Sequence, residues 1–267
     1  MEGLAGVDHW DQCYAKADDA PEYLHGLAQL AADTNAAVAG CFDAGATEVV
    51  VWDGHGRNRQ KAFMRVDLDP RASFRRLEPG APLKFAGLDA SVSGVVMVGQ
   101  HAMAGTLHGF LDHTQSPHTI CRFLINGAEH GEMSQCALHA GAFGVPLLHV
   151  SGDEALCTEA RRLFPWCVTT ATKRGTGWET CELYSAADVR AQIRRDVAQA
   201  IARANSAKVW RLPPPIEVTV EYAWSAWADQ LAATPGVRRP HARTVSWRID
   251  DPRFIYNWPC ADWHPPR

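Results

Sequence analysis

The stretch that decides the fold is VVMVGQHAMAGTLHGFLDHTQSPHTICRFLINGAEHGEMSQCALHAGAFG, residues 95–144. Two short apolar runs within it, Val95–Val98 and Cys121–Ile125, predict β-strands. His101 comes soon after the first run, and Glu132 comes soon after the second. Side chains at strand ends lie where open α/β sheets collect their ligands and catalytic groups. The stretch therefore predicts half of a metal site.

Two local signals define the rest of this stretch. Asn126-Gly127, directly after the second apolar run, favours a type I′ turn and so predicts a β-hairpin. The Ala-rich segment 133–143 predicts a helix, and Gly144 fits its C-terminal end.

The residues before this stretch follow a helix-then-strand order. Apolar positions over 23–44 recur at helical spacing, and Gly45 fits the end of that helix. The β-rich run 47–52 then leads into Asp53-Gly54-His55-Gly56. A helix, a strand and a Gly-rich polar turn in this order are typical of a parallel sheet.

Strands and helices continue to alternate through the rest of the chain. We expect further strands at 146–150, 168–172, 216–222 and 244–249, and further helices at 154–163, 186–204 and 223–233. Residues near 75–77 or 83–86 form either a strand or a loop. Lys173–Gly177 has two readings, a Gly-rich loop that binds a substrate carboxylate or a solvated turn.

Pro213-Pro214-Pro215 is the clearest interruption of the chain. We predict an α/β protein with a mainly parallel-sheet, three-layer core and a smaller C-terminal α+β lobe. Residues 1–212 are expected to form the metal-binding catalytic domain, and residues 213–267 the lobe.

Composition excludes several classes of function. The formal net charge is −4 and no Lys/Arg run exceeds two residues, so we expect no nucleic-acid partner. No apolar run reaches 18 residues, so we expect no membrane span. The first ten residues lack the features of a signal peptide. The eight cysteines form no CxxC, which favours reduced structural thiols in a cytoplasmic protein.

Four potential ligands stand at or next to glycine-containing turns: Glu2, His55, His101 and Glu132. Glycine allows close backbone approach and unusual backbone angles. Two imidazoles and two carboxylates suit zinc or another borderline divalent ion. Each residue taken alone can equally be an ordinary hydrogen-bonded side chain.

The sequence resembles the zinc-dependent D-aminopeptidases associated with dipeptide-transport operons. The segments that carry the resemblance span nearly the whole chain: residues 1–6, 48–55, 99–104, 112–114, 125–127 with 131–132, 144–146, 150–153, 171–173 and 243–245.

The resemblance implies a two-zinc peptidase. Glu2 and His55 match one side of the metal pair, and His101 and Glu132 match the other. His113 matches the family's catalytic histidine, which donates a proton to the leaving amine or stabilises the oxyanion. The spacing from His101 to His113 is one residue longer than in the family pattern, so His108 is the second candidate.

Asp53 has two readings, a partner that orients a ligand imidazole and a turn-forming Asp before glycine.

One departure from the family pattern concerns the N-terminus. The family opens with an apolar strand ending in Asp-x-Glu-Gly, whose Asp joins both metals, and Met1 stands here at the x position. Three explanations stay open: a start codon placed too late, an incomplete chain, and a site that binds metal weakly.

Three functions follow from the resemblance. The first is an aminopeptidase acting on short peptides with an N-terminal D-residue. The second is a related metal-dependent amidase with another substrate, and the third is a non-catalytic oligomeric peptide-binding relative. The resemblance also implies a ring-like homo-oligomer, with a decamer as the candidate assembly.

Overall fold

Hydrophobic strands build a four-stranded sheet in the order β3-β6-β7-β8. These strands are β3 (Val95–Gln100), β6 (Leu147–Asp153), β7 (Val168–Gly177) and β8 (Thr180–Leu183). The first three run parallel, and β8 pairs antiparallel with β7. Every residue of β6 is buried, as expected for a strand covered on both faces. The computed structural model describes residues 1–14, 17, 19–54, 67–75, 83–85 and 87–257.

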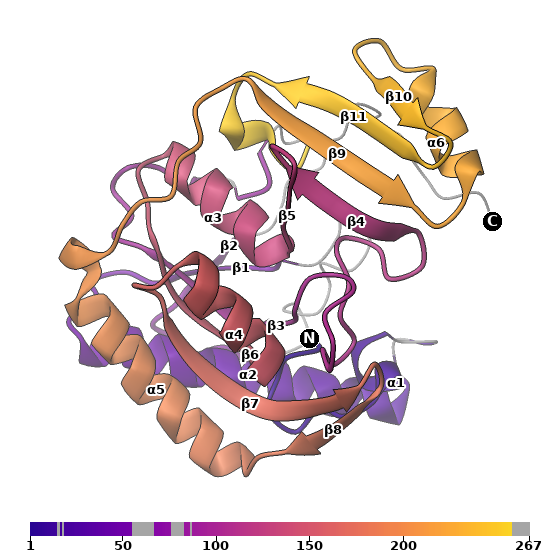
Figure 1. The fold of residues 1–267 in the computed structure, drawn as a ribbon. Helices are drawn as coiled ribbons and strands as arrows, with labels where there is room; N and C mark the ends of the chain where they lie inside the picture. The colour runs from indigo at the N-terminus through magenta and orange to yellow at the C-terminus, as the bar shows by residue number, and fades with distance from the viewer. Residues whose placement is uncertain (15–16, 18, 55–66, 76–82, 86, 258–267) are drawn as a thin grey trace.

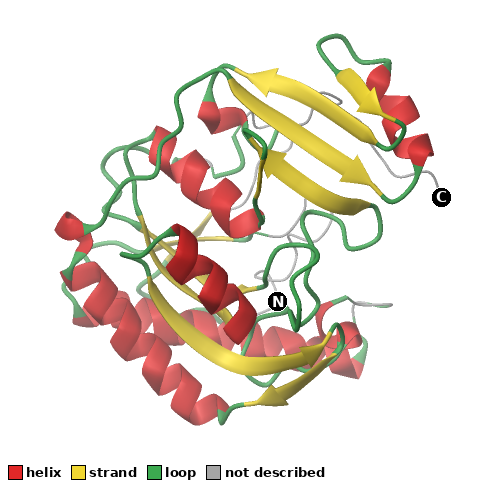
Figure 2. Ribbon diagram, in the orientation of Figure 1, coloured by secondary structure: helices red, strands yellow, loops and turns green. Residues whose placement is uncertain are grey.

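Helices cover both faces of this sheet (Figures 1 and 2). They are α2 (Pro21–Asp43), α3 (Glu132–Ala142), α4 (Glu154–Leu163) and α5 (Ala186–Ala202). Val150 of β6 packs in one cluster with Met133 of α3 and Leu156 of α4. Val96 and Val98 of β3 pack on the opposite side, with α2 and α5. This three-layer arrangement confirms the predicted α/β fold class.

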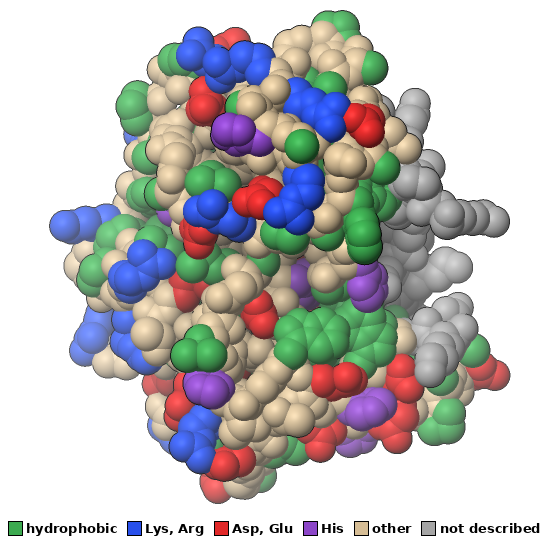
Figure 3. Space-filling model, turned by 45° about the vertical axis from the view of Figure 1, so that its right-hand side comes forward, with side chains coloured by type: hydrophobic (Ala, Val, Ile, Leu, Met, Phe, Trp, Pro, Cys, Tyr) green, Lys and Arg blue, Asp and Glu red, His purple; other side chains and the backbone are tan. Residues whose placement is uncertain are grey.

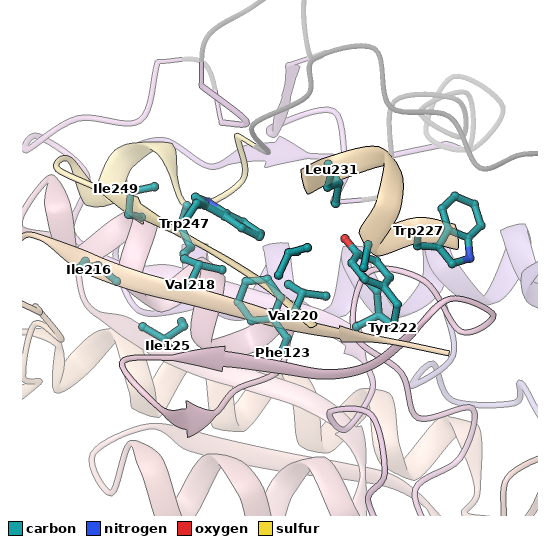
Figure 4. Close-up of a cluster of buried hydrophobic side chains, with 14 of the residues drawn as sticks. Phe123, Ile125, Ile216, Val218, Val220, Tyr222, Trp227, Leu231, Trp247 and Ile249 are labelled. Atoms are coloured by element: carbon teal, nitrogen blue, oxygen red, sulfur yellow. The ribbon is translucent and has the colours of Figure 1, made fainter. Parts of the chain in front are cut away.

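A second sheet is antiparallel, in the order β10-β11-β9-β4-β5. Its strands are β4 (Ile120–Ile125), β5 (Ala128–Glu129), β9 (Ile216–Tyr222), β10 (Arg238–His241) and β11 (Thr244–Ile249). Figure 4 shows buried side chains of these strands and of α6 (Ser225–Ala232) that belong to one hydrophobic cluster. Asn126 and Gly127 both have positive φ, 50° and 82°, so the predicted hairpin turn is present.

The β4–β5 hairpin, residues 120–129, belongs to the same sheet as the strands after residue 213. One sheet thus contains strands from both sides of residue 213. The division of the chain into domains 1–212 and 213–267 stays a prediction. Helix α3 links the two sheets, because Met133 packs toward the first and Leu138 packs into the core of the second.

The remaining described elements are short: α1 (Trp10–Cys13), β1 (Val50–Trp52), β2 (Ser73–Arg75), η2 (Ala204–Ser206) and η3 (Pro252–Phe254). β1 and β2 form a separate parallel pair. In the described part of the chain, no helix is both long and apolar enough to cross a bilayer.

The N-terminal segment lies over the carboxyl ends of the parallel strands, near the middle of the molecule (Figure 1). Gly3 donates its N–H to the carbonyl of Gly99 at 3.1 Å. A Cβ at Gly3 would lie 1.9 Å from the Gln100 carbonyl oxygen, so only glycine fits there. The fully buried Lys173 ammonium donates to the carbonyls of Glu2 and Val7.

Lys173–Gly177 is neither of the two predicted structures, a loop that binds a substrate carboxylate or a solvated turn, so both predictions are wrong. The segment is the second half of β7 and pairs with β8, and Lys173 is 0% exposed. Its lysine fixes the N-terminal segment and does not face solvent.

Candidate metal centre

Three side chains meet at the carboxyl ends of the strands: His101, His113 and Glu132. Their ligand atoms all lie within 4.8 Å of one another. The Nε2 atoms of His101 and His113 lie 3.6 and 3.7 Å from Oε1 of Glu132. Within the described ranges this is the one cluster of three or more such groups able to hold a metal ion.

Local structure explains why these residues converge. His101 comes directly after β3, and His113 lies in the loop between β3 and β4. Glu132 is the first residue of α3, with Gly131 as its N-cap. A carboxylate at a helix N-terminus is stabilised by the helix dipole. Glu132 also accepts the backbone N–H of Gln115 at 2.8 Å.

Backbone carbonyls set the protonation of both imidazoles. Nδ1 of His101 lies 3.0 Å from the Ala102 carbonyl oxygen, and Nδ1 of His113 lies 2.8 Å from that of Leu111. A carbonyl only accepts, so each Nδ1 carries the hydrogen and donates it. Each Nε2 then presents a lone pair toward Glu132, which is the form that binds a metal.

Burial favours a neutral His101, and the neighbouring charges favour an ionised Glu132. The two imidazole rings are stacked with their centroids 3.7 Å apart. Burial, reinforced by the charge of His113, lowers the pKa of His101 to about 4. Burial opposes ionisation of Glu132, but His101, His113 and Lys84 together hold the pKa of Glu132 below its ordinary value.

Glu2 and Asp53 line the same cavity as the cluster, which has a volume of about 1450 Å³. Both are buried, with 5% of each residue exposed. The charge of Glu2 acts on His101, and its carboxylate forms an ion pair with the α-amino group of Met1. His55, the remaining predicted ligand, lies outside the described residues. The ligand set of Glu2, His55, His101 and Glu132 thus stays a prediction, as does the orienting role of Asp53.

His108, the second candidate for the catalytic histidine, lies away from the cluster. It is exposed, and its Nδ1 contacts the Thr176 carbonyl at 3.3 Å. His113 is the one of the two that shares the cluster with His101 and Glu132.

Two residues near the cluster were not foreseen. Lys84 lines the cavity and its charge acts on Glu132. The Tyr14 hydroxyl lies 3.5 Å from Nε2 of His113. Neither carries a sequence signal, because both are remote in the chain from the residues that they face.

A buried carboxyl group holds the loop that follows His101. Oε2 of Glu159 accepts the Met103 N–H at 3.0 Å, and Oε1 has no hydrogen-bond partner among the described residues. Burial raises the pKa of Glu159 to about 7, from 4.5. The folded state therefore binds this proton more tightly than the unfolded state does.

We expect this group to make stability depend on pH. Its contribution is complete below about pH 4.5 and is lost as the pH rises through about 7, so the free energy of unfolding falls by up to about 3 kcal/mol across that window. Glu159→Gln removes the titrating group and should flatten the slope. Urea unfolding at several pH values, with chelator present in every sample, measures this slope. Equal slopes in both proteins would contradict the prediction.

The donor set fits zinc. An imidazole nitrogen of His101 and a carboxylate oxygen of Glu132 are ligands that zinc prefers, and the second imidazole, His113, lies beside them where it could move a proton. Both imidazoles are held in the ligating tautomer by backbone carbonyls. An α/β sheet with this cluster at its strand ends fits the class of metal-dependent hydrolases.

Comparison with known proteins identifies the family. The D-aminopeptidase family matches residues 1–259, so this chain belongs to it. The D-aminopeptidase of Bacillus subtilis (strain 168) is 28% identical over 254 residues, which cover 94% of this chain and 89% of that protein.

A solved structure agrees with this assignment. It is the Zn-dependent D-aminopeptidase DppA from Bacillus subtilis, a self-compartmentalizing protease, with a TM-score of 0.87 and 26% identity. The match covers 96% of this chain and 91% of that one. The predicted family and fold class are confirmed, and the zinc dependence of this solved relative agrees with the predicted metallo-aminopeptidase class and zinc cofactor.

Proposed function

We propose that this chain removes N-terminal D-residues from short peptides in a zinc-dependent reaction. The observation that carries the proposal is the convergence of His101, His113 and Glu132 in one cavity. The relatives named D-aminopeptidase supply the substrate class.

We assign His101 and Glu132 to one side of a two-zinc site, and Glu2 and His55 to the other. Zinc supplies Lewis-acid chemistry, polarising the scissile carbonyl and making water a stronger acid. The ionised Glu132 and the neutral His101 provide the negative charge and lone pair that a divalent ion requires.

His113 is the proposed proton carrier. Its Nδ1–H is bound to the Leu111 carbonyl, so Nε2 is the atom that takes up and releases a proton. In this role Nε2 accepts a proton from the water that attacks the carbonyl carbon, and donates it to the leaving amine as the C–N bond breaks. Glu132, 3.7 Å away, stabilises the imidazolium that exists between these two steps.

Assembly and location complete the proposal. We propose a homo-oligomer, because a solved relative is a self-compartmentalizing protease. A ring of ten subunits is the specific form, and light scattering should then give ten times the 29.3 kDa of one chain. A cytoplasmic location is supported by Cys41, Cys136, Cys157 and Cys167, which are buried and form no disulfide.

The test is hydrolysis of D-Ala-D-Ala and D-Ala-Gly-Gly by purified protein, compared with L-Ala-L-Ala, together with zinc content. We expect release of D-alanine, loss of activity on chelation, and recovery when zinc is restored. A zinc protein that cleaves neither D-peptide supports the amidase alternative. A protein that takes up no zinc, even after loading, supports the non-catalytic alternative.

A further inference from the structure

Aromatic side chains form a wall of the cavity beside His113. Trp10 and Tyr14 stack with ring centroids 3.9 Å apart and an interplanar angle of 17°. His118 and Trp178 contact Trp10 at centroid distances of 5.6 and 5.5 Å. Trp10, Tyr14 and His118 line the cavity that holds the metal cluster. We call Trp10 and Tyr14 the aromatic shelf.

The shelf is fixed relative to His113 through the β7–β8 turn. The Trp178 carbonyl accepts the Leu111 N–H at 2.6 Å, and the Trp178 indole N–H donates to the Asp112 carbonyl at 3.3 Å. Glu179, the next residue, accepts the Trp10 N–H at 3.0 Å. One short turn therefore holds both the shelf and the loop that carries His113.

The shelf presents apolar surface on the same side as the proton carrier. The Tyr14 hydroxyl lies 3.5 Å from Nε2 of His113. Trp10 is half-buried and Trp178 is 44% exposed, so aromatic surface stays open beside the cavity. Figure 3 shows hydrophobic side chains gathered next to histidines on the face turned toward the viewer.

We infer that the aromatic shelf binds the side chain of the residue on the leaving side of the scissile bond and favours an aromatic one. This inference rests on the proposed function. His113 delivers its proton to the leaving nitrogen, and the Cα carrying the next side chain is bonded to that nitrogen. That side chain therefore lies close to the ring of Tyr14, whose hydroxyl contacts His113.

Aromatic surfaces favour aromatic partners. Stacked or edge-on ring pairs add attraction beyond the burial of their area. A glycine on the leaving side offers the shelf nothing to contact. We therefore expect kcat/KM to be about tenfold higher for D-alanyl-L-phenylalanine than for D-alanylglycine, chiefly through a lower KM.

The experiment measures the ratio of kcat/KM for these two dipeptides in four proteins: wild type, Trp10→Ala, Tyr14→Leu and Trp224→Ala. We expect both shelf variants to bring the ratio to within about twofold of one. The ratio cancels any general loss of activity in Tyr14→Leu. Trp224, 67% exposed and not among the cavity-lining residues, is the matched control and should keep the wild-type ratio.

The outcomes separate the two proposals. If wild type releases no D-alanine from either dipeptide or from D-Ala-D-Ala, the proposed function has failed and the shelf assignment falls with it. If wild type cleaves both dipeptides equally well, the shelf assignment alone is overturned. If the enzyme instead prefers an aromatic side chain on the first residue of the peptide, measured with D-phenylalanylglycine, the shelf assignment is also overturned. If one shelf variant does not fold, the other variant and the wild-type ratio still decide.

Discussion

Glu132→Gln is expected to lower kcat/KM by about 10³-fold and to reduce the zinc content of the purified protein. The amide keeps the size of the side chain and its place at the start of α3, but it removes the negative charge. Oε1 of this carboxylate is the atom that both histidine Nε2 atoms face, at 3.6 and 3.7 Å. Steady-state kinetics on D-Ala-D-Ala and elemental analysis measure the two effects.

The matched control is Glu129→Gln, three residues earlier in the chain. Glu129 is exposed in β5 and forms an ion pair with Arg122. Exposed pairs of this kind contribute about 0–1 kcal/mol, so activity and zinc content should stay at wild-type levels. A Glu132→Gln protein with full activity and full zinc content would remove this carboxylate from the metal site.

His113→Ala is expected to lower kcat by about 10²- to 10⁴-fold, with zinc retained and KM little changed. The imidazole moves a proton to the leaving amine, a step that substrate binding does not require. Because Nε2 of His113 lies in the cluster, zinc content is the decisive second measurement. Loss of zinc together with activity would show that His113 is a metal ligand and not the proton carrier.

The control for His113 is His108→Asn. Residue 108 has a positive φ of 59°, and asparagine accepts this backbone conformation better than most residues. The His108 side chain is exposed and lies outside the cluster, so kcat should stay close to the wild-type value. A loss of activity comparable to that of His113→Ala would transfer the catalytic role to His108.

The sequence predicted the elements whose signals are local. The helix 154–163 and the strands 216–222 and 244–249 match the observed bounds, because each has a clear apolar period and end signals nearby. β7 was predicted only to residue 172, because Gly175 and Gly177 are typical of a loop. In the structure, a Cβ at Gly175 would lie 2.0 Å from the His108 carbonyl oxygen, so this glycine serves close packing within a strand.

Long-range pairing was beyond the reach of the sequence. Nothing local shows that the 120–129 hairpin pairs with β9, some 90 residues later. The residues of the candidate site likewise fall into two groups, those with a local sequence signal and those placed only by long-range contacts. His101 and Glu132 could be selected because each follows a predicted strand, whereas Tyr14 and Lys84 reach the cavity only through the tertiary fold.

The position of α3 couples metal affinity to global stability. Its first residue is a proposed ligand, while Leu138, about 1.7 turns further on, is fully buried among side chains of the second sheet. A cation bound at Glu132 would tie the start of this helix to the metal site, while Leu138 fixes its middle to the second sheet. By thermodynamic linkage, saturating zinc should raise the melting temperature of the whole chain, and a cavity cut at Leu138 should weaken zinc binding from a distance.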